Sequence, residues 1–347
     1  MSYSQNLKNL IRSTDPEVRS KIDAIQRTFV NARLLTPGQV FTSPALSTVS
    51  VQYRNESYIG DYLVPIVDVP RVAGTFFRYG KADRLTPHED KIGPKGTPNE
   101  VTETRSQDTY SATPHALTNY LDNETLRNAD RPLEEMTDLV EAVMDNLLLN
   151  KEIRKAELLT TAANYDAGNA VTLSGSSQWN SSTGGDPVGA FIAAGTALWN
   201  GNAPSDLWGW MGIDVYSVLR SHPAILDLFK YGGQSVGLAD ESMIAKFFGW
   251  KGLLVGTARK QTANEGQAPV YSRIWGKDAG VVRVARKPGI RAASFAYDFR
   301  VNGDPKTDVW YRPELGMSGG YQARVGFNEG LKIVANDTAY LIKAAVA

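Results

Sequence analysis

The sequence contains no cysteine among its 347 residues, which excludes disulfide bonds and thiolate metal sites. No apolar run approaches the roughly 20 residues that a membrane-spanning helix needs. The N-terminus also lacks the apolar segment that marks a signal peptide. We therefore expect a protein without a membrane span, made in a reducing cell, with no segment removed from its N-terminus.

The chain also has no excess of either sign of charge. Lys and Arg together number 37, Asp and Glu together also number 37, and the formal net charge is zero. A protein whose main task is to grip nucleic acid needs an excess of basic side chains to neutralise phosphates, so the composition argues against that class. Zero net charge also removes long-range repulsion between copies, which favours self-association.

Chemistry-bearing patterns are scarce. The three histidines, His88, His115 and His222, are far apart, and none has a second ligand at metal-binding spacing. The sequence has no nucleophile elbow, P-loop or dinucleotide-binding fingerprint. We therefore predict no catalytic residue, no cofactor and no metal, and hence not an enzyme.

Two other groups of residues receive structural interpretations. Acidic side chains that could hold a hard cation match no calcium-loop spacing, and we interpret them as a solvated face: they are Asp122, Glu124, Asp130, Glu134, Glu135 and Asp138. Tryptophans that could stack on a sugar lie within apolar runs, and we interpret them as core residues: they are Trp199, Trp208, Trp210 and Trp250.

The most unusual feature present is a long arm. Residues 64–80 (VPIVDVPRVAGTFFRYG) are rich in β-branched and aromatic residues and predict a strand. A polar stretch follows, and residues 101–121 predict a returning strand. At about 3.3 Å per residue, sides of roughly 15 residues reach on the order of 50 Å. A two-stranded ribbon is marginal alone in water, so this arm must lie on another surface.

The rest of the chain predicts a mixed α+β fold. Apolar residues at helical spacing predict a long helix over 130–159. Residues 164–187 are rich in Gly, Ser, Asn and Thr and predict a linker or surface loop at a domain boundary. Helices and strands alternate over 187–260, and strands follow from 268 onward.

The N-terminal region contains a helix-like pattern at positions 22, 25 and 29, followed by a stretch over 36–50 that we expect to be extended. The helix would pack on its own domain or dock on another subunit, and the sequence leaves both alternatives open.

The order of these parts resembles the major capsid proteins of tailed bacteriophages, the family with the Hong Kong 97-like fold. Residues 57–85 (SYIGDYLVPIVDVPRVAGTFFRYGKADRL) resemble the entry to that family's extended E-loop, and 92–101 (IGPKGTPNEV) loosely resemble its turnaround. Residues 201–232 (GNAPSDLWGWMGIDVYSVLRSHPAILDLFKYG) resemble its A-domain segment, and 333–346 (IVANDTAYLIKAAV) its final strand. The resemblance spans about residues 50–347.

The resemblance implies a division into domains. It assigns an N-terminal arm to 1–50, the start of a P-domain to 51–65, the E-loop to 66–118 and a P-domain with a spine helix to 119–186. It then assigns an A-domain to 187–285, P-domain strands to 286–327 and a C-terminal A-domain strand to 328–347.

The resemblance also implies a function. The expected activity is self-assembly through hexamers and pentamers into an icosahedral head shell that encloses double-stranded DNA, with the E-loop lying across a neighbouring subunit. Expected partners are further copies of the chain, a portal, a separate scaffolding protein, a decoration protein and packaged DNA held non-specifically, and no membrane. The expected location is the virion, after assembly in the host cytoplasm.

Charged residues near the arm tip are the predicted intersubunit contacts: they are Arg78, Arg84, Glu89, Asp90, Lys91 and Lys95. Some relatives cross-link an arm lysine to an asparagine of a neighbour. Lys91, Lys95 and Asn302 could supply such a pair, but the bond needs a desolvated lysine, and we expect non-covalent contacts.

Three other functions stay open at this point. An encapsulin-like nanocompartment protein has the same fold, but is usually shorter. A soluble α+β enzyme with an unrecognised site would be a monomer with turnover. A tail-tube or decoration protein would be smaller and mostly β, without the long helix.

Overall fold

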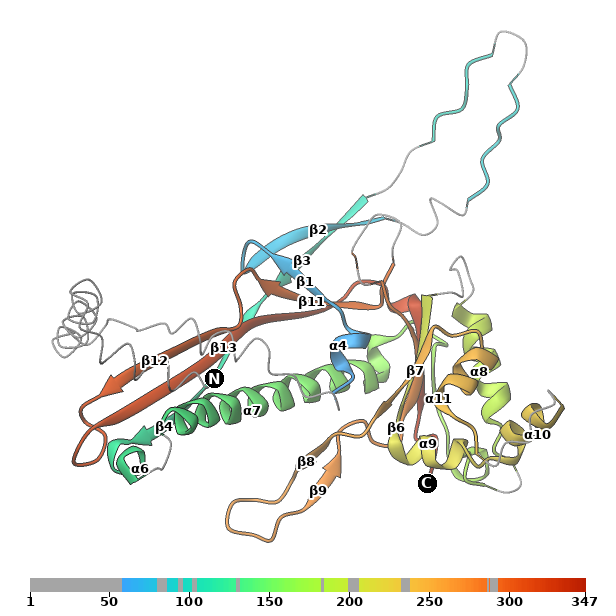
Figure 1. Ribbon diagram of the computed structural model, residues 1–347. Helices are drawn as coiled ribbons and strands as arrows, with labels where there is room; N and C mark the ends of the chain where they lie inside the picture. Colours follow the sequence, from blue (N-terminus) through green and yellow to red (C-terminus); the bar gives the residue numbers. More distant parts are fainter. Residues whose placement is uncertain are drawn as a thin grey trace, which may run out of the picture.

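The structure of the chain is a computed structural model (Figure 1). It describes residues 58–79, 86–92, 96–101, 105–128, 132–181, 184–198, 206–231, 238–285, 287 and 293–347. These residues form helices and strands in mixed order, which confirms the α+β class. None of the helices within these ranges is both long enough and apolar enough to cross a membrane. The predictions for residues 1–57 lie outside the described residues.

The first sheet has β13 at its centre, because β13 pairs with three other strands. The strand order is β1-β11-β13-β12, and β4 also pairs with β13. Its strands are β1 (Ile66–Val69), β4 (Thr113–Asp122), β11 (Ala296–Val301), β12 (Lys306–Arg312) and β13 (Gly320–Ile333). The β1–β11 pair is parallel and the others are antiparallel.

Helix α7 (Pro132–Thr160) runs along one face of this sheet (Figure 1), which confirms the predicted long helix. Pro132 occupies its first turn, where a missing backbone N–H costs nothing. The core between helix and sheet consists of Leu121, Leu139, Val140, Val143, Met144, Leu147, Val309, Ala323, Val325 and Phe327. Two short helices precede α7 in the chain, namely α4 (Gly60–Leu63) and α6 (Asn123–Asn128).

The second sheet has the order β5-β14-β10-β6-β7. Its strands are β5 (Ala170–Thr172), β6 (Leu207–Gly212), β7 (Gly252–Gly256), β10 (Ala279–Arg283) and β14 (Ala339–Lys343). The helices that lie around it are α8 (Pro187–Leu198), α9 (Ile213–Leu219), α10 (Pro223–Tyr231) and α11 (Glu241–Phe247) (Figure 1). Of the tryptophans predicted to be core residues, Trp210 and Trp250 are buried and Trp208 is partly buried against the core. Trp199 lies outside the described residues.

Two hairpins project from the body in Figure 1. The larger pairs β2 (Ala73–Tyr79) with β3 (Arg105–Ser111), and the smaller pairs β8 (Arg259–Gln261) with β9 (Tyr271–Arg273). Within the described residues, neither hairpin pairs with either main sheet.

The predicted arm strands are each divided in two. The run 64–80 forms β1, which belongs to the first sheet, and β2, which belongs to the arm. The run 101–121 likewise forms β3 in the arm and most of β4 in the first sheet. The arm is therefore anchored at both ends in the first sheet, because β1 pairs with β11 and β4 pairs with β13.

Residues 164–187 are not a simple linker. They contain β5, which pairs in parallel with β14, and the fully buried Trp179. The backbone N–H of Trp179 donates to the carbonyl oxygen of Ala345 at 2.8 Å. The interpretation as a linker is wrong because one aromatic side chain and a short strand attach this polar stretch to the second sheet. The predicted domain boundaries as a whole stay a prediction.

Candidate assembly interface

The root of the arm is held by stacked aromatic rings. Phe299 of β11 lies 4.6 Å from the ring of Tyr110 in β3 and 5.8 Å from that of Phe76 in β2, measured between centroids. The Tyr110 hydroxyl donates to the carbonyl oxygen of Arg71 at 3.3 Å. Lys332 of β13 adds an ion pair to Asp108 of β3, with an N···O distance of 2.9 Å. The lower part of the arm is therefore fixed to the first sheet.

Beyond this root, the arm buries little of its apolar surface. Phe77, the neighbour of Phe76 on the opposite face of β2, is 61% exposed. Nearer the tip, Ile92 and Val101 are also exposed. The Asn99 side-chain amide donates to the carbonyl oxygen of Glu89 at 2.8 Å and links the two sides of the tip. The arm thus presents exposed apolar side chains on a strand pair without a core of its own.

The structure describes only some of the predicted contact residues. Glu89, Asp90 and Lys91 are exposed at the tip. Arg78 lies in β2, and its side chain lies outside the described residues, as do Arg84 and Lys95. Their role as intersubunit contacts stays a prediction. His88 is exposed beside Glu89, and no group of metal-ligating side chains is found among the described residues.

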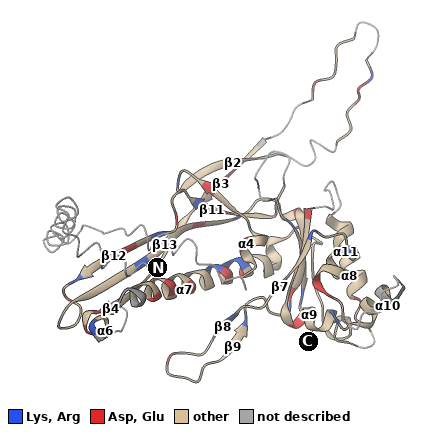
Figure 2. Ribbon diagram, viewed as in Figure 1, with Lys and Arg blue, Asp and Glu red and all other residues tan. Residues whose placement is uncertain are grey.

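A buried charge cluster lies where the arm leaves the body. Lys155 of α7 is fully buried, with its Nζ atom 2.6 Å from Asp61 Oδ1 in α4 and 3.1 Å from Asp298 Oδ2 in β11. Lys151, one turn earlier on α7, is 2.6 Å from the same Asp61 oxygen and 3.7 Å from Asp298 Oδ2. Figure 2 shows both signs of charge on α7 where it approaches α4. Two lysines therefore join α4 and β11 to α7.

Burial and pairing act on these groups in opposite directions. Burial alone would raise the pKa of Asp61, but Lys155 and Lys151 hold that pKa well below its usual value. Burial opposes the charge on Lys155, but Asp298 and Asp61 hold its pKa above the usual range. For Lys151, burial and the neighbouring Lys155 outweigh the attraction of Asp61 and Asp298, and its pKa falls to about 8. Asp61, Lys151 and Lys155 are therefore all charged at neutral pH, and Lys151 is the weaker base of the two lysines.

Glu152 fixes the entry of the chain into α4. Its carboxylate accepts hydrogen bonds from the backbone N–H groups of Ile59 and Gly60, both at 2.9 Å, and from Trp275 Nε1 at 2.8 Å. Burial raises the pKa of Glu152, although the three donors oppose that shift. A Cβ atom added to Gly60 would lie 2.6 Å from Glu152 Oε2, so this close approach requires glycine.

A second buried carboxylate joins α7 to β13. Glu329 lies in β13, and its Oε2 atom accepts a hydrogen bond from Arg154 Nε at 2.5 Å. Burial, together with the nearby Asp298, raises the pKa of Glu329. His115 of β4 is 3.9 Å from the same carboxylate. The long helix is thus connected to α4, β11 and β13 through charged side chains.

This cluster was not predicted from the sequence, in which Lys151, Arg154 and Lys155 are simply basic residues near the end of the expected helix 130–159. A signal was present. Lys151 and Lys155 continue the buried stripe of α7 in two steps of four residues from Leu147. Two lysines on the apolar face of a helix indicate buried partners.

The comparisons with known proteins agree with this architecture. No family model matches the chain. The chain is 27% identical over 304 residues to the major capsid protein of Pseudomonas phage JBD67, covering 88% of this chain and 97% of that protein. It is 24% identical over 274 residues to the major capsid protein of Burkholderia phage BcepMu, covering 77% and 85% respectively.

Solved structures share the fold. A phage-related protein from Bordetella bronchiseptica superimposes with a TM-score of 0.68 and 23% identity, covering 88% of this chain and 98% of that one. The capsid protein of cyanophage P-SCSP1u gives a TM-score of 0.57 and 11% identity, covering 89% and 91%. In sequence and in its Hong Kong 97-like fold, the chain is therefore related to the major capsid proteins of tailed bacteriophages.

Proposed function

We propose that the chain is the major capsid protein of a tailed bacteriophage, which assembles through hexamers and pentamers into the icosahedral shell around the double-stranded DNA genome. The observation that carries the proposal is the β2–β3 arm, together with the two capsid relatives. The arm is rigidly rooted through Phe299 but leaves Phe77 exposed beyond the root. A second copy is the surface that would cover it.

Repetition explains how weak contacts can hold a shell. An exposed ion pair contributes only about 0–1 kcal/mol, and Glu89, Asp90 and Lys91 are exposed at the tip. In a closed symmetric assembly every subunit repeats the same contact, so small contributions accumulate over the lattice. Exposed apolar side chains on the arm add burial at about 25 cal/mol per Å².

The remaining roles follow from the same proposal. The chain acts as a structural protein and not as an enzyme, and it needs no cofactor. It encloses DNA on its inner face without sequence preference, and its zero net charge implies that it does not grip the DNA strongly. Portal, scaffolding and decoration proteins are its further partners, and it assembles in the host cytoplasm before it resides in the virion. The capsid relatives do not favour the nanocompartment or enzyme alternatives.

A tip replacement tests the proposal. In the test variant, residues 84–97 are replaced by a short Gly-Ser turn. In the matched control, a Gly-Ser turn replaces residues 264–267 at the end of the β8–β9 hairpin. We expect both variants to keep the parental circular dichroism spectrum and a cooperative melt, since both tips bury little apolar surface. We expect shells from the control and few or none from the test variant. Normal shells from the test variant would contradict the role of the arm.

A further inference from the structure

Strand β4 leaves a long edge of the first sheet open among the described residues. Its ten residues pair with β13 from Thr113↔Glu329 to Asp122↔Gly320, and no other described strand pairs with it. No Asp, Glu, Lys or Arg occurs from Thr113 to Leu121, and Leu117 and Tyr120 are exposed. Open edges are normally protected by charge, proline, bulges or a covering segment. Pro114 protects only the first end of β4, so the stretch from Ala116 to Leu121 still lacks such protection and requires a cover.

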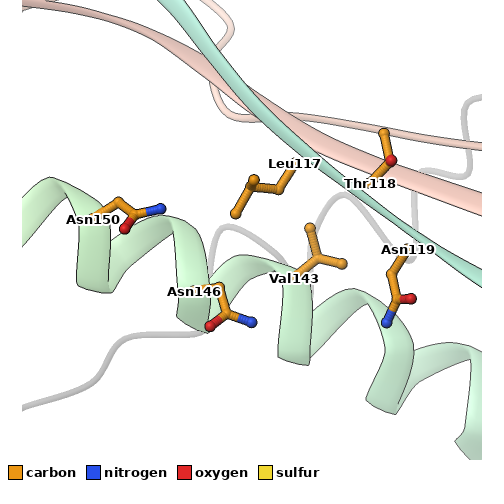
Figure 3. A pocket seen from close by; sticks show the side chains of 6 residues that line it. All are labelled: Leu117, Thr118, Asn119, Val143, Asn146 and Asn150. Atoms are coloured by element: carbon orange, nitrogen blue, oxygen red, sulfur yellow. The ribbon is translucent and has the colours of Figure 1, made fainter. Parts of the chain in front are cut away.

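A groove runs between this edge and α7. It has a volume of about 340 Å³ and is lined by Leu117, Thr118 and Asn119 of β4 and by Val143, Asn146 and Asn150 of α7. In Figure 3, Leu117 and Val143 lie between the two elements, and the three asparagine side chains project at the margins. Carboxamides both donate and accept hydrogen bonds, so they suit a peptide backbone. An uncharged, extended segment fits this groove best.

The chain itself contains such a segment. Residues 45–53 (ALSTVSVQY) carry no charge and include β-branched Thr48, Val49 and Val51, a composition typical of strands. The nine residues match the length of the open edge. Pro44 stands immediately before them, where it would disturb no ladder hydrogen bond.

The position of Tyr58 makes the groove reachable. The chain from Tyr58 enters α4 beside Glu152, which binds the Ile59 and Gly60 amides. The groove residues Asn150, Asn146 and Val143 precede Glu152 on the same helix by two, six and nine residues, or roughly 3 to 14 Å at 1.5 Å per residue. Four residues, 54–57, connect position 53 to Tyr58, and the five Cα–Cα steps can span up to about 17 Å.

We propose that residues 45–53 add to the open edge of β4 as an antiparallel strand of the same subunit and fill the groove over α7. The direction follows from the groove. Leu117 lies toward Asn150 and Asn119 toward Val143 (Figure 3), so β4 runs against α7. A segment that ends near Glu152 must run along α7 and hence against β4. Main-chain hydrogen bonds supply the affinity, and the groove selects the alternate side chains.

The absence of cysteine in the chain gives a clean disulfide test on the full-length protein. Asn146→Cys is combined in turn with a cysteine at each position from 46 to 51 and oxidised mildly. Denaturing gels without reductant are then read for a faster-migrating monomer. The matched control combines the same series with Gln261→Cys, an exposed residue on β8. We expect efficient intramolecular cross-links with Asn146→Cys that alternate with a period of two residues, and none with the control.

Absence of cross-links, or equal cross-linking in both series, would overturn the proposal. Disulfide-linked dimers would also overturn it, because they would show that a second copy supplies the segment. An independent readout uses trypsin, since Arg54 directly follows the segment. Leu117→Lys places a charge on the edge and should speed cleavage at Arg54 at least several-fold relative to Gln261→Lys. Equal cleavage rates would contradict the proposal even if the cysteine variants folded poorly.

Discussion

Replacing Lys155 with methionine should destabilise the subunit strongly. The side chain is fully buried and holds Asp61 and Asp298 at 2.6 and 3.1 Å. In the parent, two lysines balance two carboxylates. In Lys155→Met, Lys151 alone faces both carboxylates, and methionine has similar volume but no charge. Breaking a buried pair by removing one partner costs about 3–5 kcal/mol, a large share of the roughly 5–15 kcal/mol that stabilises a typical domain.

The double variant Lys155→Met/Asp298→Leu isolates the charge effect. It leaves one lysine, Lys151, opposite one carboxylate, Asp61, whose atoms are 2.6 Å apart. We expect it to lose less stability than Lys155→Met alone, since replacing both partners of a buried pair by apolar side chains is often nearly neutral. The pair is then coupled in the double-mutant cycle by at least about 1 kcal/mol.

The assay is urea unfolding of the unassembled chain, followed by the fluorescence of the buried tryptophans Trp210 and Trp275. Arg324→Met, on an exposed ion pair with Asp308, is the control and should cost no more than about 1 kcal/mol. The reasoning fails if Lys155→Met costs as little as this control. It also fails if the double variant loses the sum of the two single losses.

Three further predictions follow from the arm root and the charge cluster. The pKa of Lys151 is about 8 in the folded chain, which is below its value in the unfolded chain. From about pH 8 upward the unfolded state therefore binds more protons than the folded state, and the free energy of unfolding rises with pH. The stability of the parent relative to Lys151→Met should rise between pH 8 and 10, and a flat difference would contradict this. Gly60→Ala should cost about 1–3 kcal/mol in urea unfolding, because the added Cβ meets the Glu152 carboxylate, whereas an unchanged midpoint would show that the entry to α4 shifts freely. Phe299→Ala should cost about 3–5 kcal/mol and speed proteolysis within the arm, because Tyr110 and Phe76 lose the ring on which they pack. Unchanged proteolysis would mean that the arm is not rooted there.

The sequence predicts the elements that have strong local signals. The stripe of α7 from Leu139 to Leu147 repeats at helical spacing and is buried as expected. The apolar run of β6 also becomes a buried strand. These elements are predictable because period and composition are properties of neighbouring residues.

Long-range pairing is harder to predict from sequence. The returning run 101–121 divides at Ala112, because β4 pairs with β13 about 200 residues later, whereas β3 pairs with β2. Likewise, nothing local to Trp179 shows that its N–H binds Ala345. Strand β13 also runs unbroken from Gly320 to Ile333 although glycine weakens strand interiors, because Gly326 and Gly330 pair without interrupting the ladder.

Only part of the candidate interface is predictable from the sequence. Its projecting arm follows from a polar tip between two strand-like runs. The cluster of Asp61, Lys151, Lys155 and Asp298 joins three elements that are far apart in sequence, and only the fold brings its members together. The contact residues of the tip stay a prediction, because they would meet a second copy.

Electron microscopy of the purified full-length protein in negative stain tests the central claim most directly. The account predicts closed shells of uniform diameter, built from repeated six- and five-membered capsomers. A sample that contains only monodisperse single subunits, under every condition of protein concentration and salt and with a scaffolding protein supplied, would contradict it.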